Sequence, residues 1–432
     1  MTRSWDDVKP SPRSQFPHPL LAFSVTLAQI AAASKAAHEA AGKELISLAV
    51  GDPALDGNLP PPQALMDTLD AAVAAGKLNG YSQSHGAADV RKAIAEYWVR
   101  WFAPSMAGGA LSAKDVVISC GCSDGLSMVF GAVAGAGERL LIPEPFFPQY
   151  DMHCAYYGIE PVYYPCLAER NWEVDLDAVR ALVERDHDHK IRGILIVNPS
   201  NPTGSNFSRR HTEELVRLAD ELRLPIVADE IYAGITYNID DASAEVPSTS
   251  VADVESNATR FIVSGASKRF NIPGERMGWI IRVDPTDAGS EIMKGVLNLT
   301  SRFFIPMTPL QATMVECLRS TDDTYFAHTR KVLRENAAHM YSALSAIPGL
   351  APTKPEGGMF MPVFLKVDDL EPGVCDGISF ASKLAEEENV HVFPGETFHM
   401  PGAVRLTLSR PHSIAEEAMH RIRAFCERHS RN

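Results

Sequence analysis

The chain has 432 residues, of which 45% are hydrophobic and 22% are charged, a composition typical of a packed globular protein rather than a fibrous or disordered one. Because single domains usually span ~100–200 residues, this length favours two domains and disfavours a small binding module or a peptide hormone. The 54 acidic residues outnumber the 40 basic ones and give a net charge of -14, which disfavours nucleic acid and anionic membranes as partners.

The cysteines and the N-terminal residues indicate the cellular compartment in which we expect the protein. Seven cysteines are scattered without the paired spacing of a zinc site, so we expect no metal and a reducing environment. Charges or prolines interrupt the apolar stretches well short of the ~20 residues that span a bilayer, and Asp6 and Asp7 stand where a secretory signal needs apolar residues. These features predict a cytoplasmic protein without a membrane partner. A short organellar signal before residue 20 stays open.

The N-terminal segment, residues 1–45, is predicted to be an arm outside the main domains. Prolines at four positions within residues 1–20 favour an extended conformation there. Such an arm needs to pack on a larger body to be ordered.

Between about residues 60 and 320, short β-rich runs alternate with helical patterns. Several runs lack the polar–apolar alternation of a half-exposed strand, which is typical of central strands covered by helices on both faces. This pattern predicts an α/β fold, with a three-layer, mainly parallel large domain over residues 75–315. The expected strands are 116–118, 139–142, 158–164, 193–197, 225–228, 261–263 and 278–281, and the expected helices include 88–102, 124–134, 176–185 and 208–222, the last with Ser208 as N-cap.

After residue 320 the pattern changes. A long helix is expected over 324–346, weak strands near 359–362 and 391–393, and an amphipathic helix over 413–429. We predict a smaller α+β domain made of residues 46–74 and 316–432.

Polar residues follow several of the expected strands, and ligands gather beyond the carboxyl ends of strands in open α/β sheets. Taken singly, these residues have structural explanations: Asp229 as a helix cap, residues 201–204 as a β-turn, and Lys268 as a surface charge. Taken together they combine an anion-binding turn that opens a helix, an amide, a carboxylate, a phenol, a lysine and an arginine. They lie at 119–125, 198–204, 229–232, 264–268 and 276.

Pyridoxal 5′-phosphate requires this set: a lysine for its Schiff base, an acid for its pyridine nitrogen, hydrogen bonds to its ring oxygen and donors for its phosphate. Residues 264–278 resemble the cofactor-lysine signature of the class I aminotransferases, of pyridoxal-phosphate fold type I, and the resemblance extends from about Ile46 to the C-terminus. Gly265 and Glu275 depart from that signature, which implies one missing phosphate hydrogen bond. Within the family the likeness is greatest to tyrosine aminotransferases, in residues 46–53, 79–81, 198–208 and 393–406.

The resemblance implies roles for the residues around the cofactor. Lys268 would form the aldimine and then carry the substrate proton, and Asp229 would keep the pyridine nitrogen protonated. Tyr232 and Asn201 would bond the ring oxygen, and Phe147 would stack on the ring. The phosphate would be bound by Arg276 and by the turn at Gly121, Cys122 and Ser123.

The resemblance also implies how substrate and subunits meet. Tyr81 would reach the phosphate of a neighbouring subunit, so that a homodimer shares its active sites. Arg405 would bind the substrate α-carboxylate beside Asn201, with Gly51 allowing the backbone to approach closely. Arg302 lies near the position of a distal-carboxylate arginine in aspartate-type relatives and has an equal prospect of a structural role. A lid segment would bring two more residues to the substrate, Leu55 and Asn58.

We therefore predict a homodimeric pyridoxal-phosphate aminotransferase of aromatic amino-acid catabolism, which moves the amino group of a tyrosine-like amino acid to a 2-oxo acid. Alternatives on the same fold are a kynurenine-, alanine- or aspartate-type aminotransferase and a carbon–sulfur lyase. A regulatory protein without turnover is disfavoured by the presence of both Lys268 and Asp229. A nicotinamide dehydrogenase is disfavoured because no strand is followed by GxGxxG. The amino acceptor, the ranking of donors and any assembly beyond a dimer stay open.

Overall fold

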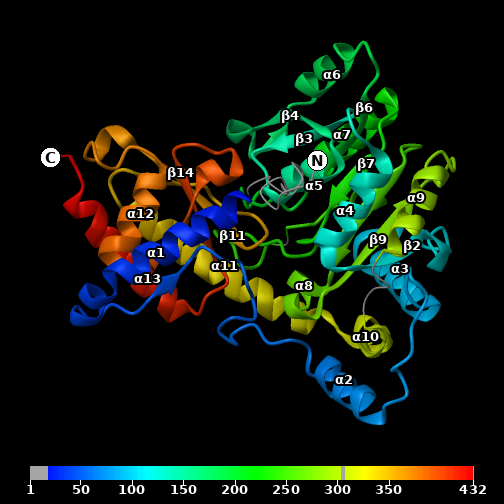
Figure 1. The fold of residues 1–432 in the computed structure, drawn as a ribbon, viewed down its shortest axis with the longest axis horizontal. Helices are drawn as coiled ribbons and strands as arrows, with labels where there is room; N and C mark the ends of the chain where they lie inside the picture. The colour runs from blue at the N-terminus through cyan, green and yellow to red at the C-terminus, as the bar shows by residue number, and fades with distance from the viewer. Residues whose placement is uncertain (1–17, 245, 303–306, 432) are drawn as a thin grey trace, which may run out of the picture.

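The computed structural model describes residues 18–244, 246–302 and 307–431 (Figure 1). Its larger sheet has eight strands in the order β2-β9-β8-β7-β6-β3-β4-β5, in which β9 and β5 run opposite to the other strands. This confirms the predicted mainly parallel α/β sheet. The strands are β2 (Val116–Cys120), β3 (Arg139–Glu144), β4 (Glu160–Leu167), β5 (Glu173–Val174), β6 (Ile191–Val197), β7 (Ile226–Asp229), β8 (Arg260–Gly265) and β9 (Met277–Val283).

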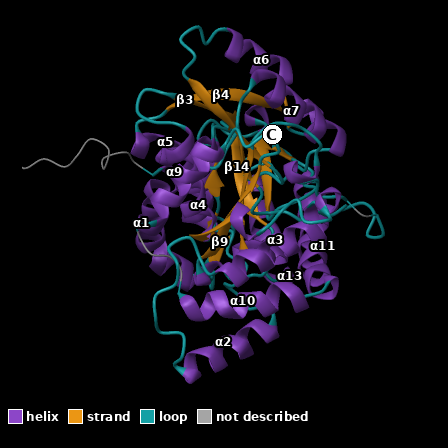
Figure 2. Cartoon of the chain, turned by 90° about the vertical axis from the view of Figure 1, so that its right-hand side faces the viewer, coloured by secondary structure: helices purple, strands orange, loops and turns teal. Residues whose placement is uncertain are grey.

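Successive residues of the central strands enter two different apolar cores. In β7, Ile226 and Ala228 belong to one core and Val227 to the other, because strand side chains alternate between the faces of a sheet. Figure 2 shows the resulting layers, with helices on both sides of the strands. One core takes residues from α3 (Ala88–Phe102), α6 (Leu176–Glu184), α7 (Arg209–Leu222) and α10 (Thr308–Ser320), and the other from α4 (Gly121–Val133), α5 (Gln149–Tyr157) and α9 (Ser290–Thr300).

Capping residues and glycines determine where several helices and strands begin or end. Ser208 caps α7, since its Oγ accepts a hydrogen bond from His211 N at 3.2 Å, as predicted. The expected strand at 158–164 begins later, at Glu160, because Gly158 ends α5 in the left-handed conformation (φ 73°).

The smaller sheet is antiparallel and has the order β10-β11-β14-β13. The strand expected near 391–393 is two strands, because β12 (Val390–His391) pairs with β1 (Ile46–Ser47) whereas β13 (Phe393–Pro394) pairs with β14. This sheet shares a third core with the surrounding helices. The remaining elements here are β10 (Leu350–Pro352), β11 (Phe360–Leu365), β14 (Ala403–Thr407), α11 (Asp323–Ser345), α12 (Gly377–Glu388) and α13 (His412–Arg428).

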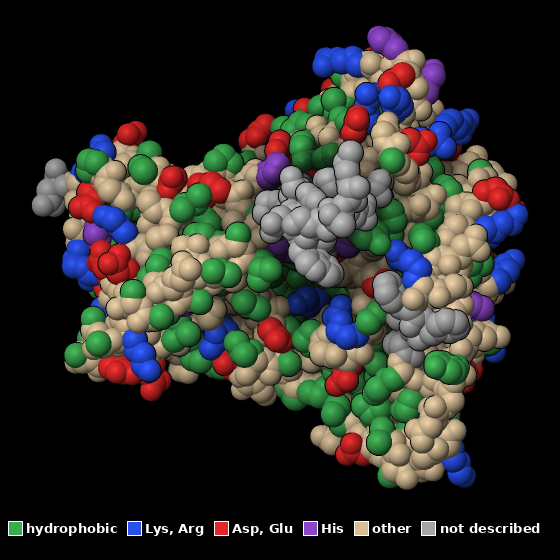
Figure 3. All heavy atoms as spheres, in the orientation of Figure 1, with side chains coloured by type: hydrophobic (Ala, Val, Ile, Leu, Met, Phe, Trp, Pro, Cys, Tyr) green, Lys and Arg blue, Asp and Glu red, His purple; other side chains and the backbone are tan. Residues whose placement is uncertain are grey.

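The two sheets and their cores agree with a large and a small lobe, and Figure 1 shows the lobes side by side. The predicted boundaries at 74/75 and 315/316 stay predictions. Helix α2 (Gln63–Ala75) packs against α10 at the lower edge of that view. Acidic and basic side chains are interspersed over the face in Figure 3.

The N-terminal arm differs from the expectation. Residues 1–17 lie outside the described residues, but α1 (Pro19–Ala40) is a helix, with Pro19 at its first turn where the missing N–H costs nothing. By length and composition α1 is apolar enough to span a membrane, and its longest uncharged stretch, residues 20–34, lies between Pro19 and Lys35. Phe23 and Leu27 enter the core of the smaller sheet, while Leu21 and Val25 are exposed.

Candidate active site

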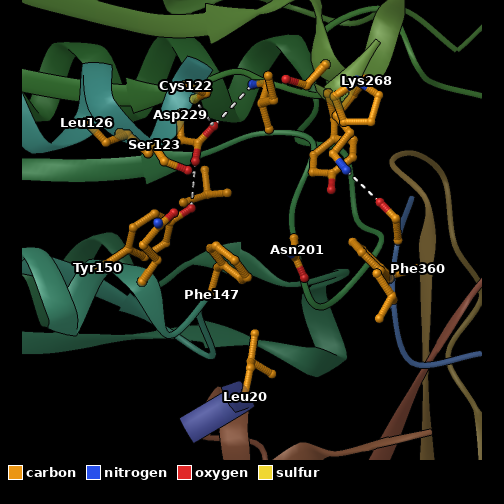
Figure 4. A pocket seen from close by; sticks show the side chains of 18 of the residues that line it. Leu20, Cys122, Ser123, Leu126, Phe147, Tyr150, Asn201, Asp229, Lys268 and Phe360 are labelled. Atoms are coloured by element: carbon orange, nitrogen blue, oxygen red, sulfur yellow. Dashed lines mark hydrogen bonds between the residues drawn. The ribbon is translucent and has the colours of Figure 1, made fainter. Parts of the chain in front are cut away.

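A cavity of 390 Å³ lies between the two sheets and gathers most of the predicted site residues. They arrive from the ends of β6 and β7, the starts of α4 and α8 (Ala266–Arg269), and strand β14. Figure 4 shows these side chains directed toward one another. The predicted residues that line the cavity are Gly51, Cys122, Ser123, Phe147, Asn201, Asp229, Tyr232, Lys268, Arg276 and Arg405.

Asp229 is the last residue of β7 and is buried. Its Oδ2 accepts a hydrogen bond from Tyr150 Oη at 2.8 Å, and its Oδ1 accepts from Ile231 N at 3.1 Å and from Cys122 Sγ at 3.6 Å (Figure 4). Burial raises the pKa of Asp229, and the Tyr150 hydrogen bond lowers it. No cation in the described part of the chain forms an ion pair with this carboxylate. The site therefore suits a cationic group of a ligand.

Lys268 lies in α8, the short helix that follows β8. Its Nζ donates a hydrogen bond to Gly51 O at 2.6 Å. Burial, with smaller contributions from Arg405 and Arg276, lowers the pKa of Lys268 to about 8, although Asp52 raises it. The amine is thus partly neutral near physiological pH, which a nucleophile and proton carrier requires.

Gly51 allows the chain to pass close to the cavity. A Cβ at this position would lie 2.4 Å from Phe360 Cζ, closer than any side chain tolerates. The carbonyl that meets Lys268 is therefore available only with glycine here.

The N-terminus of α4 and the guanidinium of Arg276 together form a positively charged region at the cavity. A Cβ on Gly121 (φ 77°) would lie 2.2 Å from Arg276 Nη2, so the guanidinium passes directly over the helix N-terminus. Arg276 donates hydrogen bonds to Pro273 O at 2.8 Å and to Cys120 O at 3.3 Å. A helix N-terminus and a guanidinium together suit a phosphate group.

Arg405, in β14, is only 2% exposed. It donates hydrogen bonds to Asn201 Oδ1 at 2.8 Å and to Ala49 O at 2.9 Å. Its guanidinium carbon lies 3.8 Å from the ring centroid of Phe360 and 4.2 Å from that of Phe398. Burial lowers its pKa to about 9, and within the described ranges its Nε has no hydrogen-bond partner. A buried guanidinium without an acidic partner suits the carboxylate of a bound substrate.

Tyr232 is buried beside Phe360, with ring centroids 6.2 Å apart. Burial raises the pKa of its phenol, so the hydroxyl stays protonated and can donate a hydrogen bond.

The sequence analysis did not predict several residues that line this cavity, among them Tyr150, Leu20 and Phe360. Tyr150 stands in α5, three residues after the predicted Phe147, and its place beyond the carboxyl end of β3 was the signal that could have revealed it. Leu20 stands in a segment predicted to be extended, and Phe360 in a strand predicted only as weak. Neither carries a local pattern that distinguishes it from a core residue.

Five predicted residues do not line this cavity of their own chain, and one of them, Gly121, lies beneath Arg276 at the start of α4. Leu55 is exposed, and Asn58 donates its amide to Ser409 O at 3.1 Å. Arg302 donates to Tyr157 Oη at 3.1 Å. Tyr81 has 94% of its surface exposed.

The chain matches the family model of aminotransferase class I and II over residues 43–422. It is 35% identical to the tyrosine aminotransferase of Mus musculus over 388 residues, which cover 90% of this chain and 82% of that protein. The structure of tyrosine aminotransferase from Leishmania infantum is similar with a TM-score of 0.89 and 31% identity, covering 99% of this chain and 100% of that one. The S-alkyl-thiohydroximate lyase of Arabidopsis thaliana is 29% identical over 398 residues, which cover 90% and 81%.

This protein therefore belongs to the class I and II aminotransferase family. Membership confirms the family and the fold that its motifs predicted, and it confirms the prediction of an enzyme of the aminotransferase class.

Proposed function

We propose that this protein is a pyridoxal-phosphate-dependent aminotransferase that takes its amino group from a tyrosine-like amino acid and passes it to a 2-oxo acid. The observation that carries the proposal is the meeting of Asp229, Lys268 and Arg405 in one cavity. Each brings a charge into a buried setting, and none forms an ion pair with another described residue. A ligand that offers a cation, a carbonyl group and a carboxylate would match all three.

The residues present fit the cofactor. Bound pyridoxal phosphate supplies an electron-accepting ring that makes the substrate α-proton acidic. Asp229 would hold the pyridine nitrogen protonated, and the turn of Gly121, Cys122 and Ser123 with Arg276 would hold the phosphate. Tyr232 and Asn201 would bond the ring oxygen, while Phe147 would cover the ring.

Lys268 would bind the cofactor carbonyl and then move the proton at the substrate α-carbon. Its lowered pKa of about 8 means that Nζ both accepts and returns a proton near neutral pH. Its hydrogen bond to Gly51 O orients the amine at the side of the cavity where Arg405 lies.

Arg405 would bind the substrate α-carboxylate. Its contacts with Asn201 and the Phe360 ring already fix the guanidinium, so little conformational freedom is lost when a carboxylate binds. Phe360 beside it and Leu20 elsewhere in the cavity lining would exclude water and receive an aromatic side chain. The tyrosine aminotransferases among the relatives support this substrate class.

We also propose a cytoplasmic protein that forms a homodimer with shared active sites; the resemblance to the family assigns Tyr81 to the phosphate of a second subunit, and its 94% exposure agrees with a position at the surface of its own chain. Mixing inactive Tyr81→Phe and Lys268→Ala proteins tests this directly. Subunit exchange should restore part of the activity, since one of the two sites in a hybrid recovers both residues. Exchange without restoration would mean that each subunit builds its own site. Roles for Leu55, Asn58 and Arg302 at the substrate stay predictions and require movement or a second subunit.

A carbon–sulfur lyase is the second candidate, favoured by the 29% identity to a lyase of Arabidopsis thaliana. Product analysis separates the two. With tyrosine and a panel of 2-oxo acids, transamination yields a new amino acid, whereas a lyase acting on a thioether amino acid releases ammonia and a 2-oxo acid without an acceptor. Amino-acid formation in stoichiometry with the tyrosine consumed supports the proposal, and acceptor-independent ammonia release contradicts it.

A further inference from the structure

A second cavity, of 540 Å³, lies on the other side of α8 from the candidate active site. It is bounded by the chain that follows β7, by the end of α3 and by the first half of α11. Nothing in the proposed transamination uses it.

Four cationic side chains line this cavity: Arg269, Arg330, Lys331 and Arg334. The acid among the lining residues, Asp323, is engaged by Arg330 through hydrogen bonds of 2.9 and 2.8 Å. Glu335 is 3.8 Å from Arg334 and 4.0 Å from Lys331, contacts at the limit of an ion pair. The cavity therefore has a surplus of positive charge, although the whole chain is acidic.

Arg269 is held rigidly at the inner side. Its guanidinium carbon lies 3.9 Å from the ring centroid of Phe326, 4.8 Å from that of Phe102 and 4.9 Å from that of Trp101. Its Nη1 donates a long hydrogen bond of 3.3 Å to Ala233 O. With 6% of its surface exposed, this cation is almost fully desolvated.

Two buried donors at this cavity lack acceptors among the described residues: Arg269 Nε and Trp101 Nε1. Buried N–H groups in folded proteins are almost always paired, because an unpaired one loses its hydrogen bond to water without compensation. Thr236 and Ser243 also line the cavity, but their hydroxyl groups already donate to Val246 O and to Asp241 Oδ1. The unpaired donors and the surplus cations are what match the oxygens of a tetrahedral anion.

We propose that this second cavity is a binding site for phosphate or a small phosphate monoester. Arg330 and Arg334, four residues apart on one face of α11, supply guanidinium groups, of which Arg330 is held in place by Asp323, and Arg269 with Trp101 supplies fixed donors at the inner side.

The first experiment titrates inorganic phosphate into the protein saturated with pyridoxal phosphate, at constant ionic strength, by calorimetry. The double variant Arg330→Gln/Arg334→Gln should bind phosphate at least about tenfold more weakly, because two charge-assisted contacts are lost. The matched control Arg210→Gln/Arg223→Gln removes the same charge from side chains that are 80% exposed, and its Kd should equal that of the wild type. Equal weakening in both variants, or no binding to the wild type, would overturn the proposal.

A second measurement locates the ligand. Phosphate should change the fluorescence of Trp101, and Trp101→Phe should remove that change. If the double variant does not fold, Lys331→Gln replaces it, because this side chain is 63% exposed and its loss leaves the core intact. That variant should bind phosphate about threefold more weakly. An unchanged Kd in Lys331→Gln, or a fluorescence change that survives in Trp101→Phe, would place the anion elsewhere and contradict the site.

Discussion

Lys268 and Arg269 are neighbours in one short helix, yet they line two different cavities. The cavity of Lys268 contains a buried carboxylate, Asp229, and a largely apolar lining. The cavity of Arg269 contains further cations and hydroxyl groups. Adjacent residues of a helix diverge by about 100°, so a single turn is enough to direct one charge to each side.

Burial lowers the pKa of both side chains, but with different consequences. Lys268 reaches a pKa of about 8 and can exchange a proton near neutral pH. Arg269 keeps its proton, because a guanidinium is too basic to lose it under the same burial. The comparison teaches that burial makes a lysine suitable for proton transfer and leaves an arginine suitable for anion binding.

The largest expected effect is at Lys268. Lys268→Ala should lower kcat by at least about 10³-fold, because both covalent attachment and proton transfer are lost. Borohydride treatment should fix the cofactor to the Lys268 peptide of the wild type, as mass spectrometry would detect. Phosphate binding to the second cavity should be unchanged, which separates the two sides of α8. A variant that retains a tenth of the wild-type turnover would contradict the assigned role.

Asp229→Asn should cause the next largest fall in kcat. A neutral amide cannot stabilise a protonated pyridine nitrogen, and losing such a preorganised partner costs about 3–4 kcal/mol, or roughly 10²–10³-fold in kcat. Steady-state kinetics and the unfolding temperature are measured together. Near-normal kcat with an unchanged unfolding temperature would mean that Asp229 is only a structural residue at the end of β7.

Arg405→Ala should reduce kcat/KM by roughly tenfold to a hundredfold for every substrate, because all of them carry the α-carboxylate and the charge-assisted contact contributes ~1.5–3 kcal/mol. Arg302→Ala is the matched comparison. If Arg302 meets a distal carboxylate, this variant raises KM for glutamate and 2-oxoglutarate alone, by about tenfold, and leaves tyrosine unaffected. An equal effect on both substrate classes, or none, would leave Arg302 with its hydrogen bond to Tyr157 as a structural role.

Tyr150→Phe should give a smaller effect with a characteristic pH dependence. The Tyr150 hydroxyl stabilises the ionised carboxylate of Asp229 and lowers its pKa. Without it the pKa of Asp229 rises, so the acidic limb of the kcat profile should move to higher pH, with roughly tenfold lower kcat. A profile that only drops in height, without moving, would show that Tyr150 acts by packing alone.

The smallest effect that we expect is a loss of folding stability when Gly234 is replaced. Gly234 has a φ of 72°, and a Cβ there would lie 1.4 Å from Arg269 Nη1. Gly234→Ala should therefore destabilise the protein by about 1–3 kcal/mol and weaken phosphate binding by displacing Arg269. Gly42→Ala is the control, because its φ of 65° carries the same backbone strain with no atom within 4 Å of the new Cβ. The free energy of unfolding of both variants is measured by urea unfolding. If both lose the same amount, the contact with Arg269 is not the cause of the loss.

Much of the fold and of the candidate site was predictable from the sequence, where the signal was local. Apolar runs followed by turn residues predicted the strands that end near Asp229 and Lys268, and the carboxyl ends of parallel strands meet at one edge of a sheet. Ser208 predicted the start of α7 because an N-cap acts within four residues. The family resemblance added Arg405, whose neighbours in the sequence carry no catalytic pattern.

Only the tertiary structure decided the rest. Arg405 meets Asn201 across 204 residues, and Leu20 enters the cavity from a helix that the prolines had obscured. The side of α8 toward which Arg269 points, and the cations from α11 that it joins, depend on how α3, α8 and α11 pack. Hydrophobic periodicity reports which residues of a segment are buried, but not which other segment covers them. Pairing between distant segments is chosen by the fit of whole surfaces, and for that reason the second cavity had no counterpart in the sequence analysis.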